Sequence, residues 1–218
     1  MASQAHDLSL AETRSPPRSG RARGKREAII AAAKQVFFQE GYAGAAMDRI
    51  TAEAGVSKAT VYNHFRSKEE LLLAVVDDVI VPFHAEYRAV LDHEAPFIEW
   101  LTALAITVAR KATTPETIAL TRLMMAEALR FPKLGRTFIK IATHDTLKLY
   151  RPKFQQAIDA GILRKGDVHH MMERFVESCA SRPQRAFLYS DPNPMTPEQI
   201  DEHARETVQF FLHGYAVG

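Results

Sequence analysis

Hydrophobic side chains recur at the spacing of one helix face along the first part of this chain, from Lys25 onward. Residues three, four or seven positions apart share such a face, and this spacing is found in Ile30, Ala33 and Phe37, in Met47, Ile50 and Ala54, and in Val61 and Phe65. Gly41 and Gly55 follow the first two segments, where a glycine commonly ends a helix. The three apolar stripes can be buried only against each other, which predicts a small three-helix unit.

The remaining helices are marked by capping residues and prolines. Residues 67–70 (Ser-Lys-Glu-Glu) and 196–199 (Thr-Pro-Glu-Gln) fit the capping box, in which the Ser or Thr accepts from an early N–H and the fourth residue reaches back. Thr114 provides a cap before Pro115. These marks predict helices at about 68–91, 97–111, 115–130, 133–160, 167–189 and 196–214, with bends or breaks at Pro82, Pro152 and Pro183. No segment from residue 25 to 218 has the pattern of a β-strand, so the predicted fold class is all-α.

Positive charge is concentrated near the N-terminus. Residues 1–70 carry 11 Lys and Arg against 8 Asp and Glu, a net charge of +3, whereas the rest of the chain has a net charge of −1. Six of the cations lie within residues 14–26, which contain no acidic residue. Residues 1–24 lack an apolar face and are predicted to be disordered. The basic block is either a solvated tail or an arm that contacts DNA phosphates or the minor groove.

Residues 47–65 have the pattern of two short helices joined by a tight turn. Gly55 can adopt the left-handed conformation of such a turn, Val56 can fill the gap between the helices, and Ser57 can cap the second helix. Polar side chains able to reach phosphates or base edges occupy the exposed side of that helix: Lys58, Thr60, Tyr62, Asn63 and His64. This pattern is typical of a helix-turn-helix whose second helix enters the DNA major groove. A helical bundle with an ordinary polar surface is the alternative.

Residues 54–72 (AGVSKATVYNHFRSKEELL) resemble the signature of the TetR family of repressors: Ala-Gly-Val-Ser, then Thr, Tyr, His-Phe, and Ser-Lys-Glu before leucines. The resemblance extends over residues 25–75 and implies DNA-binding roles for Ser57, Lys58, Ala59, Thr60, Tyr62, Asn63, His64 and Lys68. Lys58, Thr60 and Asn63 correspond to positions on bases or the adjoining backbone. Tyr62, His64 and Lys68 correspond to phosphate contacts.

One departure from the family pattern concerns the start of the second helix. A threonine usually caps that helix, but this chain has Ala45 and Ala46 there, and neither alanine can cap or donate to a phosphate. The basic arm at residues 14–26 could offset the missing anchor, which is a hypothesis.

The resemblance further implies three parts: a basic arm (1–24), a DNA-binding domain (25–70) and a domain for effector binding and dimerisation (71–218). Residues 123–134 and 210–215 resemble the AefR-like C-terminal subgroup. The implied partners are a palindromic double-stranded DNA operator, a second copy of the chain and a small effector that releases the DNA. A homodimer also fits the physics, because one recognition helix contacts too few bases to specify a genomic site. The residues do not distinguish a repressor from an activator.

Candidates for an effector cavity are the large side chains at helical spacing, although most such side chains belong to an ordinary core: Trp100, Met124, Met125, Phe138, His144, Tyr150, Phe175 and Cys179. Few charges lie along these stripes, which favours an apolar or aromatic ligand. The last helix has one stripe that either docks on its own domain or, with Phe187 and the 167–189 helix, forms a dimer interface: Ile200, Ala204, Val208 and Phe211.

Other functions have little support in the sequence. No nucleophile elbow, phosphate-binding glycine loop, zinc-protease motif or dinucleotide fingerprint is present, so neither an enzyme nor a cofactor is expected. His170 and Glu173 share a helix face, but no further ligand pair accompanies them, and no metal is expected. Cys179 has no intrachain partner and no apolar run approaches ~20 residues, which indicates a cytoplasmic protein without a membrane span. An architectural DNA-binding protein would need no hollow second domain.

Overall fold

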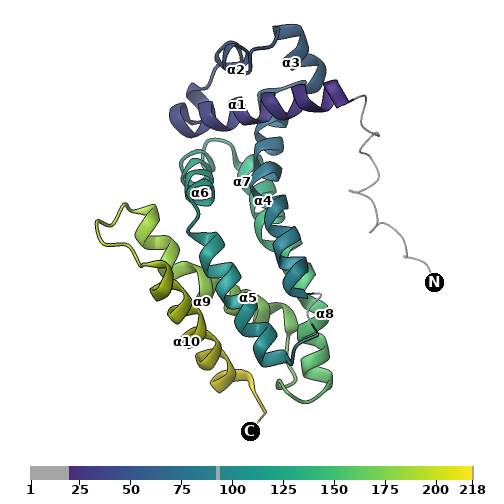
Figure 1. Ribbon diagram of the computed structural model, residues 1–218, viewed down its shortest axis with the longest axis vertical. Coiled ribbons are helices and arrows are strands. Elements are labelled where there is room, and N and C mark those ends of the chain that lie inside the picture. The colour runs from purple at the N-terminus through teal and green to yellow at the C-terminus, as the bar shows by residue number, and fades with distance from the viewer. Residues whose placement is uncertain (1–19, 92–93, 218) are drawn as a thin grey trace, which may run out of the picture.

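The computed structural model describes residues 20–91 and 94–217, and these residues fold almost entirely into helices (Figure 1). The elements in chain order are α1 (Gly20–Gly44), α2 (Met47–Glu53), α3 (Lys58–His64), α4 (Lys68–Leu91), α5 (Phe97–Ala112), α6 (Pro115–Glu127), α7 (Pro132–Ile139), the π-helical segment η1 (Lys140–Asp145), α8 (Thr146–Asp159), α9 (Val168–Leu188) and α10 (Pro197–Tyr215). No strand occurs in this part of the chain, where one isolated bridge pairs Leu163 with Ala216. The all-α prediction is confirmed.

The first three helices form a unit at one end of the molecule, and α4 runs from it into the second domain (Figure 1). The predicted stripes meet as expected, since Phe37, Ile50 and Val61 are fully buried. Their core continues without a gap into α4 through Leu71 and Val75 and on to α6. The three-helix unit therefore shares one hydrophobic core with the two helices that connect it to the rest of the molecule.

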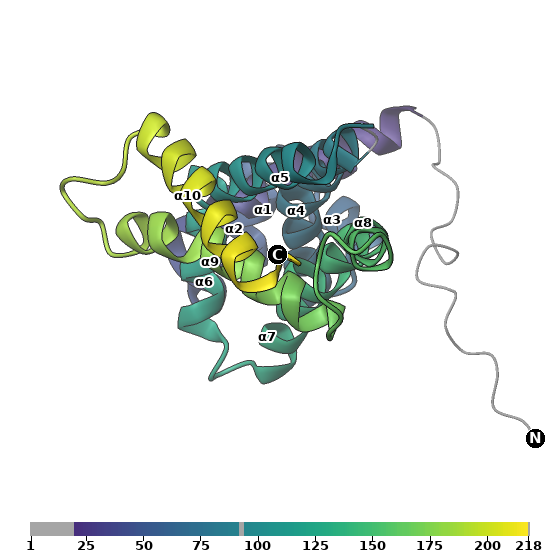
Figure 2. The same cartoon turned by 90° about the horizontal axis from the view of Figure 1, so that it is seen from below.

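A second core holds the remaining helices together. Trp100 and Phe154 pack edge to face with ring centroids 5.9 Å apart, and Phe175 and Phe211 do so at 5.1 Å. These rings come from α5, α8, α9 and α10, and Figure 2 shows α10 lying along α9 and α5. The terminal stripe of Ile200, Ala204, Val208 and Phe211 is buried in this core. The stripe was predicted either to pack on its own domain or to form a dimer interface. In the structure it packs on its own domain.

The predicted helix ends agree with the structure to within three residues for the helices at 68–91, 97–111, 115–130, 167–189 and 196–214. The predicted helix 133–160 is wrong as a single α-helix, because η1 widens the winding in its middle. The helices continue past Pro82, Pro152 and Pro183, so none of these prolines breaks its helix, and the kink at Pro82 and the bends at the other two stay predictions.

The N-terminal helix begins at Gly20, five residues before the predicted start at Lys25. The first 19 residues of the predicted disordered arm lie outside the described residues. Among the helices that the structure describes, none combines the length and the apolar character needed to cross a membrane.

Candidate nucleic-acid interface and ligand cavity

The turn between α2 and α3 has the predicted geometry. Gly55 has φ 61°, the left-handed conformation that a residue with a side chain adopts only at a cost. Ser57 then leaves the helical region, with φ −74° and ψ 153°, and its Oγ accepts a hydrogen bond from the N–H of Thr60 at 3.2 Å. Val56 is half-buried against the core. The start of α3 is therefore fixed by backbone conformation and by a side-chain cap, as the sequence predicted.

The two sides of α3 differ as the sequence predicted. Val61 and Phe65 are buried in the core. Tyr62 is 43% exposed, and the solvent-facing side also includes exposed Ser57, Lys58, Ala59 and Asn63 with half-buried Thr60 and His64. The helix α3 itself lies at one end of the molecule, with α1 between it and the second domain (Figure 1). A polar surface of one helix thus stands at an end of the molecule, where DNA could approach it.

Lys58 is paired with Asp48 on α2. The Lys58 Nζ lies 2.6 Å from the Asp48 carboxylate, and both side chains are exposed. The hydrogen bond to Asp48 raises the pKa of Lys58, so its ammonium is charged at neutral pH. A phosphate or a base acceptor that binds Lys58 has to compete with this carboxylate.

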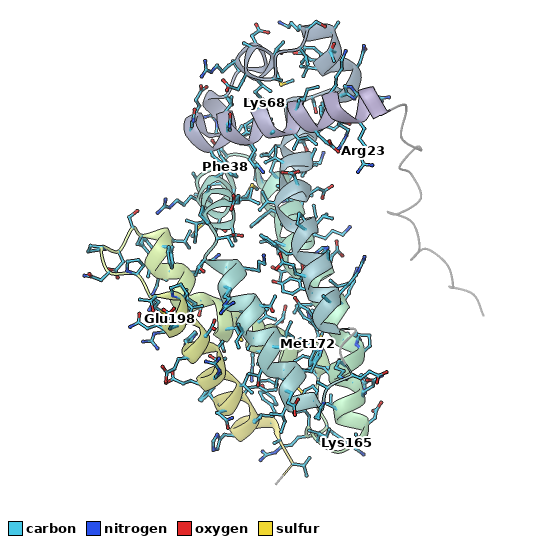
Figure 3. The ribbon with its side chains drawn as sticks, viewed as in Figure 1. Arg23, Phe38, Lys68, Lys165, Met172 and Glu198 are labelled. Atoms are coloured by element: carbon cyan, nitrogen blue, oxygen red, sulfur yellow. The ribbon has the colours of Figure 1, made fainter. Side chains whose placement is uncertain are left out.

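Half-buried Lys68 is the first residue of α4 and lies against the three-helix unit (Figure 3), where it binds the backbone. Its Nζ donates to the carbonyl oxygens of Ala45 at 2.9 Å and Ala43 at 3.3 Å, and it lies 4.7 Å from the centre of the Tyr42 ring. Partial burial lowers the pKa of Lys68. Lys68 therefore joins α4 to the connection between α1 and α2. The phosphate contact that the resemblance implies for it stays a prediction.

The beginning of α2 lacks a side-chain cap, as its sequence predicted. Ala46 is the N-cap residue, and no side-chain hydrogen bond satisfies the first N–H groups of the helix. Ala45 is buried in the core. Any anchor for a phosphate at this helix end has to come from backbone N–H groups.

Glu127, which sequence reasoning missed, connects the second domain to α1. The residue is 9% exposed, and its carboxylate accepts from the Ala43 N–H at 3.0 Å. Next to it, the Tyr42 and Phe131 rings pack edge to face with centroids 4.9 Å apart. The helix α1 loses helical geometry here, at Gly41 with φ 73° and ψ 167°. The one available signal was a carboxylate inside the apolar run 123–129.

The helix α6 is also tied to the end of α9. The Arg122 guanidinium donates to the carbonyl oxygens of Phe187 at 2.7 Å and Leu188 at 3.0 Å, and to the Ser190 hydroxyl at 2.9 Å. The two carbonyls belong to the last turn of α9, and a cation stabilises this end of a helix. One short helix, α6, thus has a hydrogen-bonded link to the three-helix unit and another to α9.

A cavity of about 310 Å³ lies between α4, α5, α6, α9 and the η1–α8 region. Its apolar walls include Val79, Phe83, Tyr87, Val108, Leu120, Phe138, Leu147 and Val176. Threonines at 117, 121, 143 and 146, with Lys111, Glu177 and Gln184, add polar groups. The volume is at the small end of the range for ligand sites. Both α4 and α6, which share the core of the three-helix unit, line this cavity.

Of the predicted effector residues, only Phe138 lines this cavity. Four belong to the second core (Trp100, Tyr150, Phe175 and Cys179), and Met124 packs in the core shared with α1. Met125 is 62% exposed and His144 is exposed. These candidates are wrong for this cavity because helical spacing does not say which way each face is turned. Burial raises the pKa of the Cys179 thiol to about 12, which makes it unreactive at neutral pH.

No group of three or more metal-binding side chains is present in residues 20–91 and 94–217. The Glu173 carboxylate lies 3.2 Å from His169 Nε2, four residues before it, instead of pairing with His170. His170 is directed towards Asp167, with His170 Nδ1 and the carboxylate 3.7 Å apart.

Family models match both parts of the chain. Residues 29–75 match the N-terminal domain of the bacterial regulatory proteins of the tetR family, and residues 99–217 match the C-terminal domain of AefR-like transcriptional repressors. The solved structure of a TetR-family transcriptional regulator from Mesorhizobium loti MAFF303099 is 28% identical, with a TM-score of 0.78 over 91% of this chain and 100% of that one.

Curated relatives match over part of the chain. The transcriptional activator FasR of Mycolicibacterium smegmatis is 41% identical over 73 residues, 32% of this chain and 33% of that protein. The transcriptional regulator BetI of Rhizobium meliloti is 30% identical over 125 residues, 56% of this chain and 61% of that protein. The matched segments thus span between a third and three fifths of these relatives. These proteins are regulators and not enzymes, and the chain belongs to the TetR family of transcriptional regulators.

Proposed function

We propose that this chain is a repressor that binds a palindromic operator as a homodimer in the cytoplasm and leaves it when a small apolar or aromatic effector binds. The observation that carries the proposal is the exposed polar side of α3, held by the Gly55 turn and the Ser57 cap. Two copies of α3 would enter successive major grooves, about 34–36 Å apart. The cavity supports the effector part of the proposal, because α4 and α6 line it and also pack on the DNA-binding unit.

The proposed DNA contacts follow the exposure of each side chain. Lys58, Thr60 and Asn63 face base edges or the adjoining backbone, while Tyr62 and His64 bind phosphates. Ser57 and Ala59 bring the beginning of α3 close to the DNA, where its free N–H groups attract a phosphate. The ammonium of Lys68 donates to backbone carbonyls, and its positive charge still attracts the phosphates of DNA bound to α3.

The proposed dimer uses the outer side of α9 and α10. Phe210 is 77% exposed on α10, next to a hollow lined by Arg174, Ser178, Thr207 and Gly214. An aromatic ring this exposed is unusual on a surface that meets only water and is typical of an interface. Phe187 is half-buried near the end of α9. The effector then acts by favouring a spacing of the two α3 helices that no longer fits the operator.

The test compares Tyr62→Ala with Ile98→Ala on an operator selected from genomic fragments by the purified protein. Losing a hydrogen bond to a charged phosphate should weaken binding by about 10-fold or more in fluorescence anisotropy. Ile98 is 48% exposed at the start of α5, away from α3 and outside the proposed dimer surface, so its variant should bind as the unchanged chain does. Full operator affinity in a Lys58→Ala, Tyr62→Ala double variant would overturn the proposed interface.

Activation is the second candidate, because FasR is named as an activator. Transcription of the gene next to the operator decides between the two. In a strain lacking this chain, transcription rises if the protein represses the gene and falls if it activates it.

A further inference from the structure

The charged groups around the cavity are already engaged or face solvent. Lys111 is the basic residue among the described residues that line it, and its ammonium pairs with the Glu86 carboxylate and lies 4.9 Å from the centre of the Phe83 ring. Glu177 is the acidic lining residue and is exposed on α9. A ligand carboxylate would have to displace Glu86 from Lys111, and an ammonium would lose its hydration for a single exposed carboxylate. Neither kind of ion is favoured in this cavity.

Uncharged polar groups, in contrast, are available on three sides of the cavity. Thr121 on α6, Thr143 in η1 and Gln184 on α9 are half-buried, and their side chains form no hydrogen bond with another residue of the described ranges. The other two lining threonines are engaged. The Thr117 hydroxyl accepts from Thr114 at 2.8 Å, and that of Thr146 lies 3.0 Å from His84 Nε2. A ligand with polar groups at more than one edge could satisfy the three free side chains together.

The space between these polar groups is bounded by rings and branched aliphatic side chains. Phe83 and Tyr87 come from α4, and Phe138 comes from α7. Rings of this kind pack favourably against an aromatic face, edge to face or offset. A volume of about 310 Å³ suits a compound of a few rings.

We infer that the cavity binds an uncharged aromatic compound with hydroxyl or carbonyl groups at two or more edges, which Thr121, Thr143 and Gln184 recognise. The inference rests on the proposed function only in taking this cavity as the effector site. It sharpens the expected apolar or aromatic ligand by adding peripheral hydrogen-bonding groups and by excluding organic acids.

Three compounds with one scaffold test the inference by calorimetry on the full chain without DNA: 4,4′-dihydroxybiphenyl, biphenyl and biphenyl-4-carboxylate. The diol should bind about tenfold more tightly than either of the others, because it alone offers neutral groups at both ends. Thr121→Val and Thr143→Val each remove a hydroxyl and keep the side-chain size. Each should weaken diol binding by about three- to tenfold and leave biphenyl binding unchanged.

Thr107→Val is the matched control, because this half-buried threonine of α5 donates to the Ala103 carbonyl and does not line the cavity. Tighter binding of the carboxylate, unchanged diol binding in both cavity variants, or no heat from the three compounds at about 1 mM would overturn the inference. Operator release is measured separately. A diol that binds but releases no operator contradicts the proposed regulation alone, whereas release by an organic acid without diol binding contradicts the ligand class alone.

Discussion

Three residues far apart in the sequence hold the connection between α1 and α2. Lys68 donates to the carbonyls of Ala43 and Ala45, and Glu127 accepts from the N–H of Ala43. Buried backbone groups that lack a helical partner have to be satisfied in some such way. Gly41 makes the arrangement possible, because φ 73° with ψ 167° is accessible to glycine and to almost no other residue.

Replacing Gly41 by alanine should therefore lower the free energy of unfolding by about 2 kcal/mol. The effect is backbone strain, because the new Cβ would lie 3.4 Å from the Glu127 carboxylate, an ordinary van der Waals distance. Gly44 lies three residues further along in helical conformation, and Gly44→Ala should be neutral or slightly stabilising. Urea denaturation followed by circular dichroism measures both variants. Equal stabilities of the two variants would contradict the assigned role of Gly41.

The partners of Lys68 and Glu127 could not be predicted from the sequence. A resemblance placed Lys68 among the DNA contacts, whereas its carbonyl partners depend on a turn geometry that the motif does not specify. Glu127 and Ala43 are 84 residues apart, and no periodicity links positions so distant. The Ser57 cap was predictable because donor and acceptor are only three residues apart.

At the level of elements, apolar spacing predicted the helices well and their rotation poorly. Met124 and Met125 are neighbours on α6, yet one is buried against α1 and the other is mostly exposed, while Thr121 faces the cavity. The spacing of apolar residues defines one face of a helix, but it does not say which neighbouring element that face packs against. The prediction of one helix over 133–160 was wrong because apolar spacing assumes 3.6 residues per turn along its whole length. The wider turn of η1 rotates every later side chain relative to α7.

The helix α6 is the element best placed to relay a signal. Thr117, Leu120 and Thr121 of α6 line the cavity. Glu127, the last residue of the same helix, accepts a hydrogen bond from Ala43. A ligand that shifts α6 would therefore act directly on the end of α1. This link is testable because the coupling between two binding sites is reciprocal.

Glu127→Ala should leave effector binding intact and reduce its dependence on operator DNA. In the unchanged chain the effector dissociation constant should differ by about 5- to 150-fold between the free and operator-bound protein, and in the variant this ratio should approach one. Glu116→Ala is the control, because Glu116 is an exposed carboxylate at the other end of the same helix. Calorimetry with and without operator gives the ratio. Undiminished coupling in Glu127→Ala would show that the signal takes another route, such as α4.

At the scale of the whole molecule, the cavity and the proposed dimer surface share a wall. Glu177, Ala180 and Gln184 on α9 line the cavity and also a hollow on the outer side of that helix, beside Arg174 and Ser178. A second copy packed on α9 and α10 would cover this hollow. Effector binding and dimerisation should then be linked, because the partner would exclude water from one wall of the cavity.

Phe210→Glu tests this link, since it places a charge on the 77% exposed ring position at the centre of the proposed interface. The variant should sediment as a monomer, bind operator at least about tenfold more weakly and bind effector more weakly as well. Leu129→Glu is the matched control, because Leu129 is 95% exposed after α6 and away from the proposed dimer surface. A monomeric variant with full effector affinity would mean that one chain closes the cavity by itself. A dimeric variant would place the interface elsewhere, because a buried, unpaired carboxylate facing its own copy across a two-fold axis is too costly to retain.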